Sequence, residues 1–184
     1  MDKIKILGIV GSLREGSYNK SLMNSALELV PKGAILEVAD ISQIPIFNQD
    51  LENGLPEPVI KFKKQIKESD AILFATPEYN YSIPGPLKNA IDWASRPYPD
   101  NSWDDKPVAV MSASGGMIGG ARAQYHLRQT FVFLNMHPLN KPEVIVTFAN
   151  EKIDENGMLT DEHTKKKIKE LLDALVVWTK RLKK

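Results

Sequence analysis

The sequence predicts an α/β domain in which helices cover both faces of a parallel sheet. Five short apolar runs are bounded by Gly, Pro or Asp, a pattern typical of strands buried on both faces. Segments with helical spacing of apolar residues separate these runs. The chain has 184 residues, 42% hydrophobic and 26% charged, which suffice for one globular core. We therefore expect a single domain over residues 1–184.

The expected strands and helices alternate along the chain. The strands are expected at residues 4–10, 34–39, 71–75, 108–111 and 144–148. Four helices are expected at residues 22–30, 59–66, 87–94 and 121–134, and a fifth carries an apolar stripe from Ile168 to Leu182. Pro84-Gly85-Pro86 signals the start of the third helix, and Thr160 or Asp161 is the expected cap of the last.

This alternation favours right-handed crossovers between parallel strands. Five strands in a chain of this length fit the flavodoxin-like order 2-1-3-4-5, a three-layer sandwich. Ligands in such folds bind beyond the carboxyl ends of the strands, near the point where the strand order reverses. The loops after the first, third and fourth strands are therefore the candidate binding segments.

The loop after the first strand, residues 11–19, combines features of an anion site. It leads from a strand into a helix, so its amides and the positive helix end favour an anion. Ser12, Ser17 and Asn19 add neutral donors, and Arg14 adds a cationic fork. Its glycines have P-loop spacing, but the Lys and hydroxyl residue of a P-loop do not follow, which argues against ATP hydrolysis. The loop suits a monophosphate, although an ordinary turn with capping serines explains it equally well.

The loop after the third strand, residues 76–85, is rigid and aromatic. Its amides suit the polar edge of a flat heteroaromatic ring, and Tyr79 or Tyr81 suits its face or rim. A structural turn with exposed tyrosines is the alternative. Glu78, taken alone, is more often a solvated carboxylate than a catalyst. Trp93 and Trp103 are candidates for the wall of an acceptor pocket or for a dimer contact.

The loop after the fourth strand, residues 112–120, contains two glycine pairs. They permit close approach of the backbone to a ligand edge, or a mobile gate. A plain flexible loop explains them as well. Taken together, one loop at this end of the sheet suits a phosphate and two suit a planar ring, which points to flavin mononucleotide (FMN).

Three segments resemble a known family. Gly11-Ser12-x-Arg14-x-x-Ser17-x-Asn19 resembles the phosphate signature of the NADPH-dependent FMN reductase family. Residues 77–93 are similar to its flavin-ring segment, and residues 119–129 to its bacterial chromate and quinone reductase branch. The resemblance covers the whole chain.

The resemblance implies roles for individual residues. The FMN phosphate would be held by Ser12, Arg14, Ser17 and Asn19, with Tyr18 alongside. The isoalloxazine ring would be bordered, chiefly through the backbone, by Pro77, Glu78, Tyr79, Asn80 and Tyr81, and approached by Ser114 and Gly115. No acid–base catalyst and no metal ligand is assigned.

The resemblance also implies a homodimer or homotetramer. Arg122, Tyr125 and Glu143 match positions associated in this branch with a hydrogen-bond network at a subunit interface. A helix interior explains these residues equally well.

The expected function is an FMN-dependent NAD(P)H:acceptor oxidoreductase. NADPH or NADH would transfer a hydride to flavin N5 and leave, and an acceptor would then take its place in a ping-pong reaction. Quinones are the expected acceptors, with chromate, azo dyes or free flavin as further ones. The alternative is a flavodoxin-like electron carrier that is not an enzyme, but such carriers are usually strongly acidic, whereas the net charge here is +1.

Composition excludes several other classes. The absence of Cys removes disulfides, thiolate metal sites and cysteine nucleophiles, so both half-reactions must pass through the cofactor. Residues 163–184 carry eight basic and two acidic side chains. We interpret them as a solvated helix face rather than a nucleic-acid or membrane contact. The chain has no apolar run of membrane-spanning length and no signal-peptide pattern at its start, so we expect a cytoplasmic protein.

Overall fold

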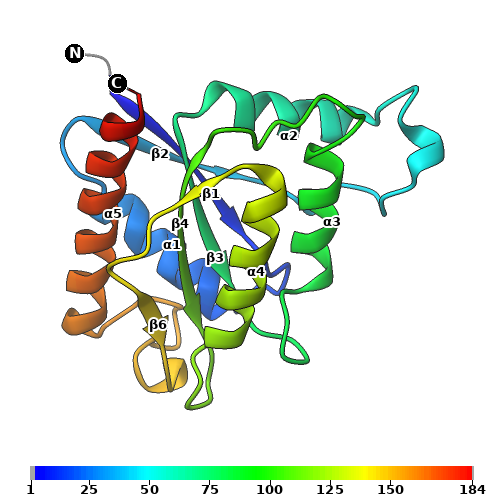
Figure 1. Ribbon diagram of the computed structural model, residues 1–184. Helices are drawn as coiled ribbons and strands as arrows, with labels where there is room; N and C mark the ends of the chain where they lie inside the picture. The colour runs from blue at the N-terminus through cyan, green and yellow to red at the C-terminus, as the bar shows by residue number, and fades with distance from the viewer. Residues whose placement is uncertain (1–2, 184) are drawn as a thin grey trace.

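The computed structural model describes residues 3–183. Its strands form one parallel sheet in the order β2-β1-β3-β4-β5, with β6 also paired to β4 (Figure 1). The strands are β1 Ile4–Val10, β2 Ala34–Ala39, β3 Ala71–Thr76, β4 Pro107–Ala113, β5 His137–Pro138 and β6 Val144–Val146. The predicted fold class and strand order are confirmed.

Helices cover both faces of the sheet (Figure 1). They are α1 Tyr18–Leu29, α2 Glu57–Glu68, α3 Gly85–Ala94, α4 Ala121–Leu134 and α5 Glu162–Leu182. One core lies between the sheet and α1 and α5, and the other between the sheet and α2, α3 and α4. Strands β3 and β4 are buried at every position, because both of their faces are covered.

Trp93 and Trp103 belong to the second core, so the expectation that they line an acceptor pocket is wrong. Both are fully buried. Trp103 packs edge-on against Phe62, with ring centroids 5.8 Å apart. Each indole N–H donates to a main-chain carbonyl, of Pro45 at 2.8 Å and of Ile91 at 3.0 Å respectively. Burial of such large apolar surfaces stabilises the core. Because each indole N–H has a hydrogen-bond acceptor, the rings are buried without the cost of an unpaired donor.

The edge of the sheet beyond β4 differs from the prediction. One strand was expected over residues 144–148, whereas two short strands, β5 and β6, share this edge. The strand β6 ends at Val146 because the chain turns away: Phe148 has a left-handed φ of 49° and precedes the short 3-10 helix Ala149–Glu151.

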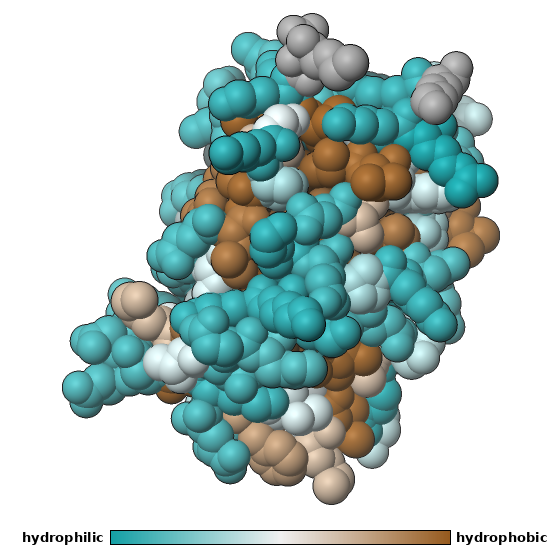
Figure 2. All heavy atoms as spheres, turned by 90° about the vertical axis from the view of Figure 1, so that its left-hand side faces the viewer, coloured by the Kyte–Doolittle hydropathy of each residue, from teal (hydrophilic) through white to brown (hydrophobic). Residues whose placement is uncertain are grey.

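The basic segment near the C-terminus forms most of α5. Three lysines of α5 pair with carboxylates on the same helix, as in Lys169–Asp173 at 2.7 Å. Hydrophilic side chains cover most of the face on which α5 lies (Figure 2). Residue 184, at the end of this segment, lies outside the described residues. Among the described residues, no helix combines the length and apolar character needed to cross a membrane.

Asp161 caps α5. It is one of the two residues, Thr160 and Asp161, predicted for this role. Its carboxylate accepts hydrogen bonds from the amide of Thr164 at 2.8 Å and from the Thr164 hydroxyl at 2.5 Å. These hydrogen bonds lower the pKa of Asp161 below its usual value.

Replacing Asp161 by Ala should lower the free energy of unfolding by about 1 kcal/mol at pH 7, measured by urea denaturation, because α5 loses its cap. The lowered pKa means that the ionised carboxylate stabilises the fold above its unfolded pKa of about 3.9, and that this contribution is lost as the pH falls through the folded pKa. D161N retains a good cap without the charge, so it should stay close to the wild type at pH 7. Equal losses in D161A and D161N would contradict the capping role.

Candidate functional site

A cavity of about 170 Å³ lies where the loops after β1, β3 and β4 meet, at the carboxyl ends of these strands. We call it the three-loop cavity. It is lined by every predicted flavin-binding residue except Asn80 and Tyr81, with Ala113 in addition. The topology therefore brings together segments that are widely separated in the sequence, at the edge where parallel sheets bind ligands.

The β1 side of the three-loop cavity offers donors to an anion. The helix α1 begins at Tyr18, and the Ser17 side chain before it makes no capping hydrogen bond. The first turn of α1 contains no acidic residue, so the positive end of the helix dipole is not neutralised. Arg14 is exposed and its guanidinium lies 5.3 Å from the centre of the Tyr18 ring. Free hydroxyl, amide and guanidinium donors are the chemistry that a monophosphate requires.

Asn19 has a structural role that the sequence did not indicate. Its amide donates to the Ala113 carbonyl at 3.0 Å, and its side-chain oxygen accepts from the Ala113 amide at 2.9 Å. The side chain is almost fully buried. It thereby fixes the start of α1 against the end of β4, across 94 residues of sequence. Its direct contact with a phosphate stays a prediction.

The β3 side of the cavity contains a two-residue turn. The amide of Tyr79 donates to the Ser82 carbonyl at 3.0 Å, and that of Ser82 to the Tyr79 carbonyl at 2.9 Å. Between them Asn80 and Tyr81 have φ of 50° and 66°, which defines a type I′ turn. Asn tolerates this conformation, but for Tyr it costs about 1–2 kcal/mol. Neither central residue lines the cavity.

Glu78 is neither a solvated carboxylate nor a group free for catalysis. Its side chain is 8% exposed and accepts from the amides of Arg122 and Ala123 at 3.0 and 3.2 Å. It also accepts from the Arg122 guanidinium at 2.5 Å, and this hydrogen bond raises the pKa of Arg122. The same guanidinium lies 3.5 Å from the centre of the Tyr81 ring. We call this cluster of Glu78, Arg122 and Tyr81 the Glu78 clamp.

One feature of the sequence indicates indirectly that a residue from elsewhere must bind the start of α4. The residue before α4 is Gly120, which has no side chain to cap the helix, and no other cap residue stands nearby. A helix end without a local cap needs partners from elsewhere. Glu78 supplies them from 44 residues away.

The two glycine pairs in the loop after β4 differ in their packing. A Cβ added at Gly119 would lie 2.7 Å from Ile145 Cγ2, and one at Gly120 would lie 2.8 Å from Ser112 Cβ. Both glycines have left-handed φ, so this pair is required by packing and cannot act as a gate. Gly115 and Gly116, in contrast, are exposed beside the cavity.

The buried polar core beneath this loop was also not predicted. Gln124 donates to the Ser112 hydroxyl at 2.8 Å and to the Val144 carbonyl at 2.9 Å. Ser112 in turn donates to the Gly119 carbonyl at 2.7 Å. These bonds join α4, β4, β6 and the loop into one unit.

The three residues expected at a subunit interface have different surroundings in this structure. Arg122 belongs to the Glu78 clamp, whereas Tyr125 is 61% exposed and Glu143 is also exposed. Their joint network stays a prediction.

The sequence profile described as NADPH-dependent FMN reductase matches residues 4–151. This chain belongs to the NADPH-dependent FMN reductase family. The assignment confirms the predicted class, an FMN-dependent oxidoreductase with NAD(P)H as electron donor, over the alternative of a carrier that is not an enzyme.

Two curated relatives match over nearly their full length. An NAD(P)H-dependent FMN reductase of Pseudomonas aeruginosa is 54% identical over 183 residues, which cover 99% of this chain and 98% of that protein. An NAD(P)H:quinone oxidoreductase of Solanum tuberosum is 52% identical over 187 residues, which cover 98% and 95%.

The fold is shared with solved structures. FerB, a flavoenzyme NAD(P)H:(acceptor) oxidoreductase from Paracoccus denitrificans, is 39% identical with a TM-score of 0.89, covering 97% of this chain and 98% of that one. An FMN-dependent NADH-azoreductase from Bacillus anthracis, solved with FMN, has a TM-score of 0.62 at 16% identity, covering 95% and 99%. The second likeness concerns the fold alone.

Replacing Glu78 by Ala should lower the free energy of unfolding by about 2 kcal/mol, because two amides and a guanidinium lose a buried acceptor. E78Q retains one acceptor oxygen and should lie between E78A and the wild type. The exposed Glu28 on α1 provides the control, since E28A should change stability by less than about 0.5 kcal/mol. Urea denaturation measures all three variants, and an E78A protein as stable as E28A would refute the clamp.

Proposed function

We propose that the chain holds FMN in the three-loop cavity and reduces quinones with NAD(P)H. The cavity itself carries this proposal: anion donors that the protein leaves free lie on one side, and an aromatic and peptide wall lies on the other. The donor set fits the cofactor, since hydroxyls, amides and Arg14 suit a monophosphate. Relatives named as quinone reductases support the acceptor class.

Each side of the cavity has its own task in this proposal. Ser12, Arg14 and Ser17 bind the phosphate, with Tyr18 alongside and Asn19 fixing the loop against β4. The ring is bordered by Pro77, Glu78, Tyr79, Ser114 and Gly115, with Asn80 and Tyr81 in the turn behind them. FMN, when bound, supplies the hydride chemistry. The chain orients the ring and presents peptide donors to its polar edge.

Donor and acceptor use one site in turn, because one cavity joins all three loops. Chromate, azo dyes and free flavin are further acceptors that such an open site admits.

We also propose a homodimer or homotetramer that uses the outer face of α4. Val132 and Phe133 on this helix are 84% and 87% exposed, an unusual exposure for large apolar side chains, and Arg122 and Tyr125 lie on the same helix.

R14A and S17A should each weaken FMN binding about tenfold or more, because a charge-assisted hydrogen bond contributes about 1.5–3 kcal/mol and Ser17 adds a hydroxyl donor. Fluorescence titration of the flavin-free protein measures this loss. Riboflavin has the same ring but no phosphate, so its affinity should remain unchanged. Equal losses for FMN and riboflavin would place both residues outside the phosphate site.

Steady-state kinetics test the shared site. Initial rates at several fixed NADPH concentrations, with a quinone as the varied substrate, should give parallel double-reciprocal lines. Intersecting lines would show that donor and acceptor are bound together and would overturn the alternating use of one site.

A further inference from the structure

A second cavity opens beside the three-loop cavity, at the carboxyl ends of β1 and β2. We call it the α1–β2 cavity. It has a volume of about 480 Å³ and lies between α1 and the loop that follows β2. Ser12 lines both cavities, so they adjoin each other. The volume lies within the range of small-molecule sites.

Apolar side chains form much of the wall of the α1–β2 cavity. Leu13, Leu27 and Val38 line it and are 52%, 39% and 40% exposed, so they present apolar surface to water. The buried Met23 and Ile41 also line it. A flat aromatic base that covers these side chains would remove apolar area from water, which is favourable.

The α1–β2 cavity also contains one cationic and one anionic side chain. Lys20 lines it from α1, and Asp40 lies at the end of β2. Asp40 accepts from the Ser42 amide at 2.8 Å, and hydrogen bonds from Ser42 with the charges of Lys61 and Lys20 lower its pKa. The site thus offers an ammonium group for a phosphate and an ionised carboxylate for a sugar hydroxyl.

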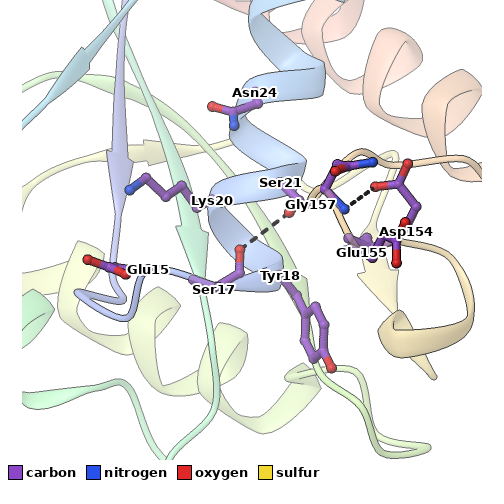
Figure 3. A pocket seen from close by; sticks show the side chains of 12 residues that line it. Glu15, Ser17, Tyr18, Lys20, Ser21, Asn24, Asp154, Glu155 and Gly157 are labelled. Carbon is purple, nitrogen blue, oxygen red and sulfur yellow. Dashed lines mark hydrogen bonds between the residues drawn. The ribbon is translucent and has the colours of Figure 1, made fainter.

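A third cavity, of about 410 Å³, lies on the other side of α1 and has the wrong charge for a dinucleotide. Glu15, Asp154 and Glu155 line it (Figure 3). Lys20 borders this cavity too, but its side chain extends on the side of α1 opposite Asp154 and Glu155 (Figure 3). Three carboxylates repel the phosphates of NAD(P)H, so this cavity is not a site for them.

We propose that the α1–β2 cavity binds the adenosine end of the NAD(P)H donor. The inference rests on the proposed function, which places the nicotinamide at the three-loop cavity. The adenosine is joined to the nicotinamide riboside through two phosphates, so it reaches beyond the reacting ring into an adjoining site. The base packs on Leu13, Leu27 and Val38, and Lys20 binds phosphate. Asp40 accepts from the 3′-hydroxyl of the adenosine ribose, which NADPH and NADH both carry.

The substitution Leu27→Glu tests this assignment, because it puts a carboxylate on the wall that the adenosine would cover. Leu27 is partly exposed on a helix, and Glu is a good helix former. Anaerobic stopped-flow mixing of the FMN-loaded protein with a donor reports flavin reduction, and its concentration dependence gives the donor dissociation constant. The matched control is L27Q, which has the size of Glu without its charge.

We expect L27E to weaken NADPH and NADH about tenfold, which corresponds to about 1.4 kcal/mol. Reduced nicotinamide mononucleotide lacks the adenosine, so its dissociation constant should be the same in L27E, L27Q and the wild type. In the wild type 5′-AMP should compete with NADPH, and in L27E it should compete less well.

Two results from the L27E titrations would overturn the adenosine site alone: an unchanged dissociation constant for NADPH in L27E, or an equal loss for NADPH and the mononucleotide. Failure of 5′-AMP to compete in the wild type would also overturn it. A wild-type protein whose bound flavin is reduced by neither NADPH, NADH nor the mononucleotide would instead overturn the proposed function together with the site.

Discussion

The carboxylate of Glu78 is the interaction on which the arrangement of the three-loop cavity depends. It stands just after β3 and accepts hydrogen bonds from the first turn of α4 and from the Arg122 guanidinium. Because the side chain is almost buried, these bonds form in a medium of low dielectric constant, where they are strong. The β3 loop and the start of α4, which follows the β4 loop, are therefore held in one fixed relation.

Two local costs are offset by this single carboxylate. The helix α4 begins after a glycine and lacks a cap of its own, and Tyr81 occupies a left-handed conformation that is unfavourable for a large side chain. Glu78 satisfies the helix amides directly. It also fixes Arg122 under the Tyr81 ring, and the cation–π contact stabilises the turn. The position of Asn19 follows the same principle on the β1 side, where one amide fixes α1 to the end of β4.

Much of this structure could be predicted from the sequence, because burial and helical periodicity are local properties of the chain. The five helices and strands β1 to β4 lie where the apolar patterns indicated, and the strand order followed from their alternation. The loops were correctly predicted to meet, since the carboxyl ends of parallel strands share one edge. The partners of individual polar side chains could not be predicted, because Glu78 and Asn19 bind groups 44 and 94 residues away. Trp93 and Trp103 were misplaced for a related reason: no local pattern distinguishes a tryptophan at a pocket from one whose N–H is satisfied in the core.

The close packing of Gly119 and Gly120 restricts where this protein can change. Both positions exclude any side chain, and the other end of the loop is held by the Ser114 amide, which donates to the Val146 carbonyl at 3.1 Å. The side chains of Met117 and Ile118 at the tip of the loop are 71% and 41% exposed and take part in neither restraint. Evolution can therefore vary the tip beside the cavity without disturbing the sheet beneath it. Divergence in acceptor range within such a scaffold is expected to concentrate in these two positions.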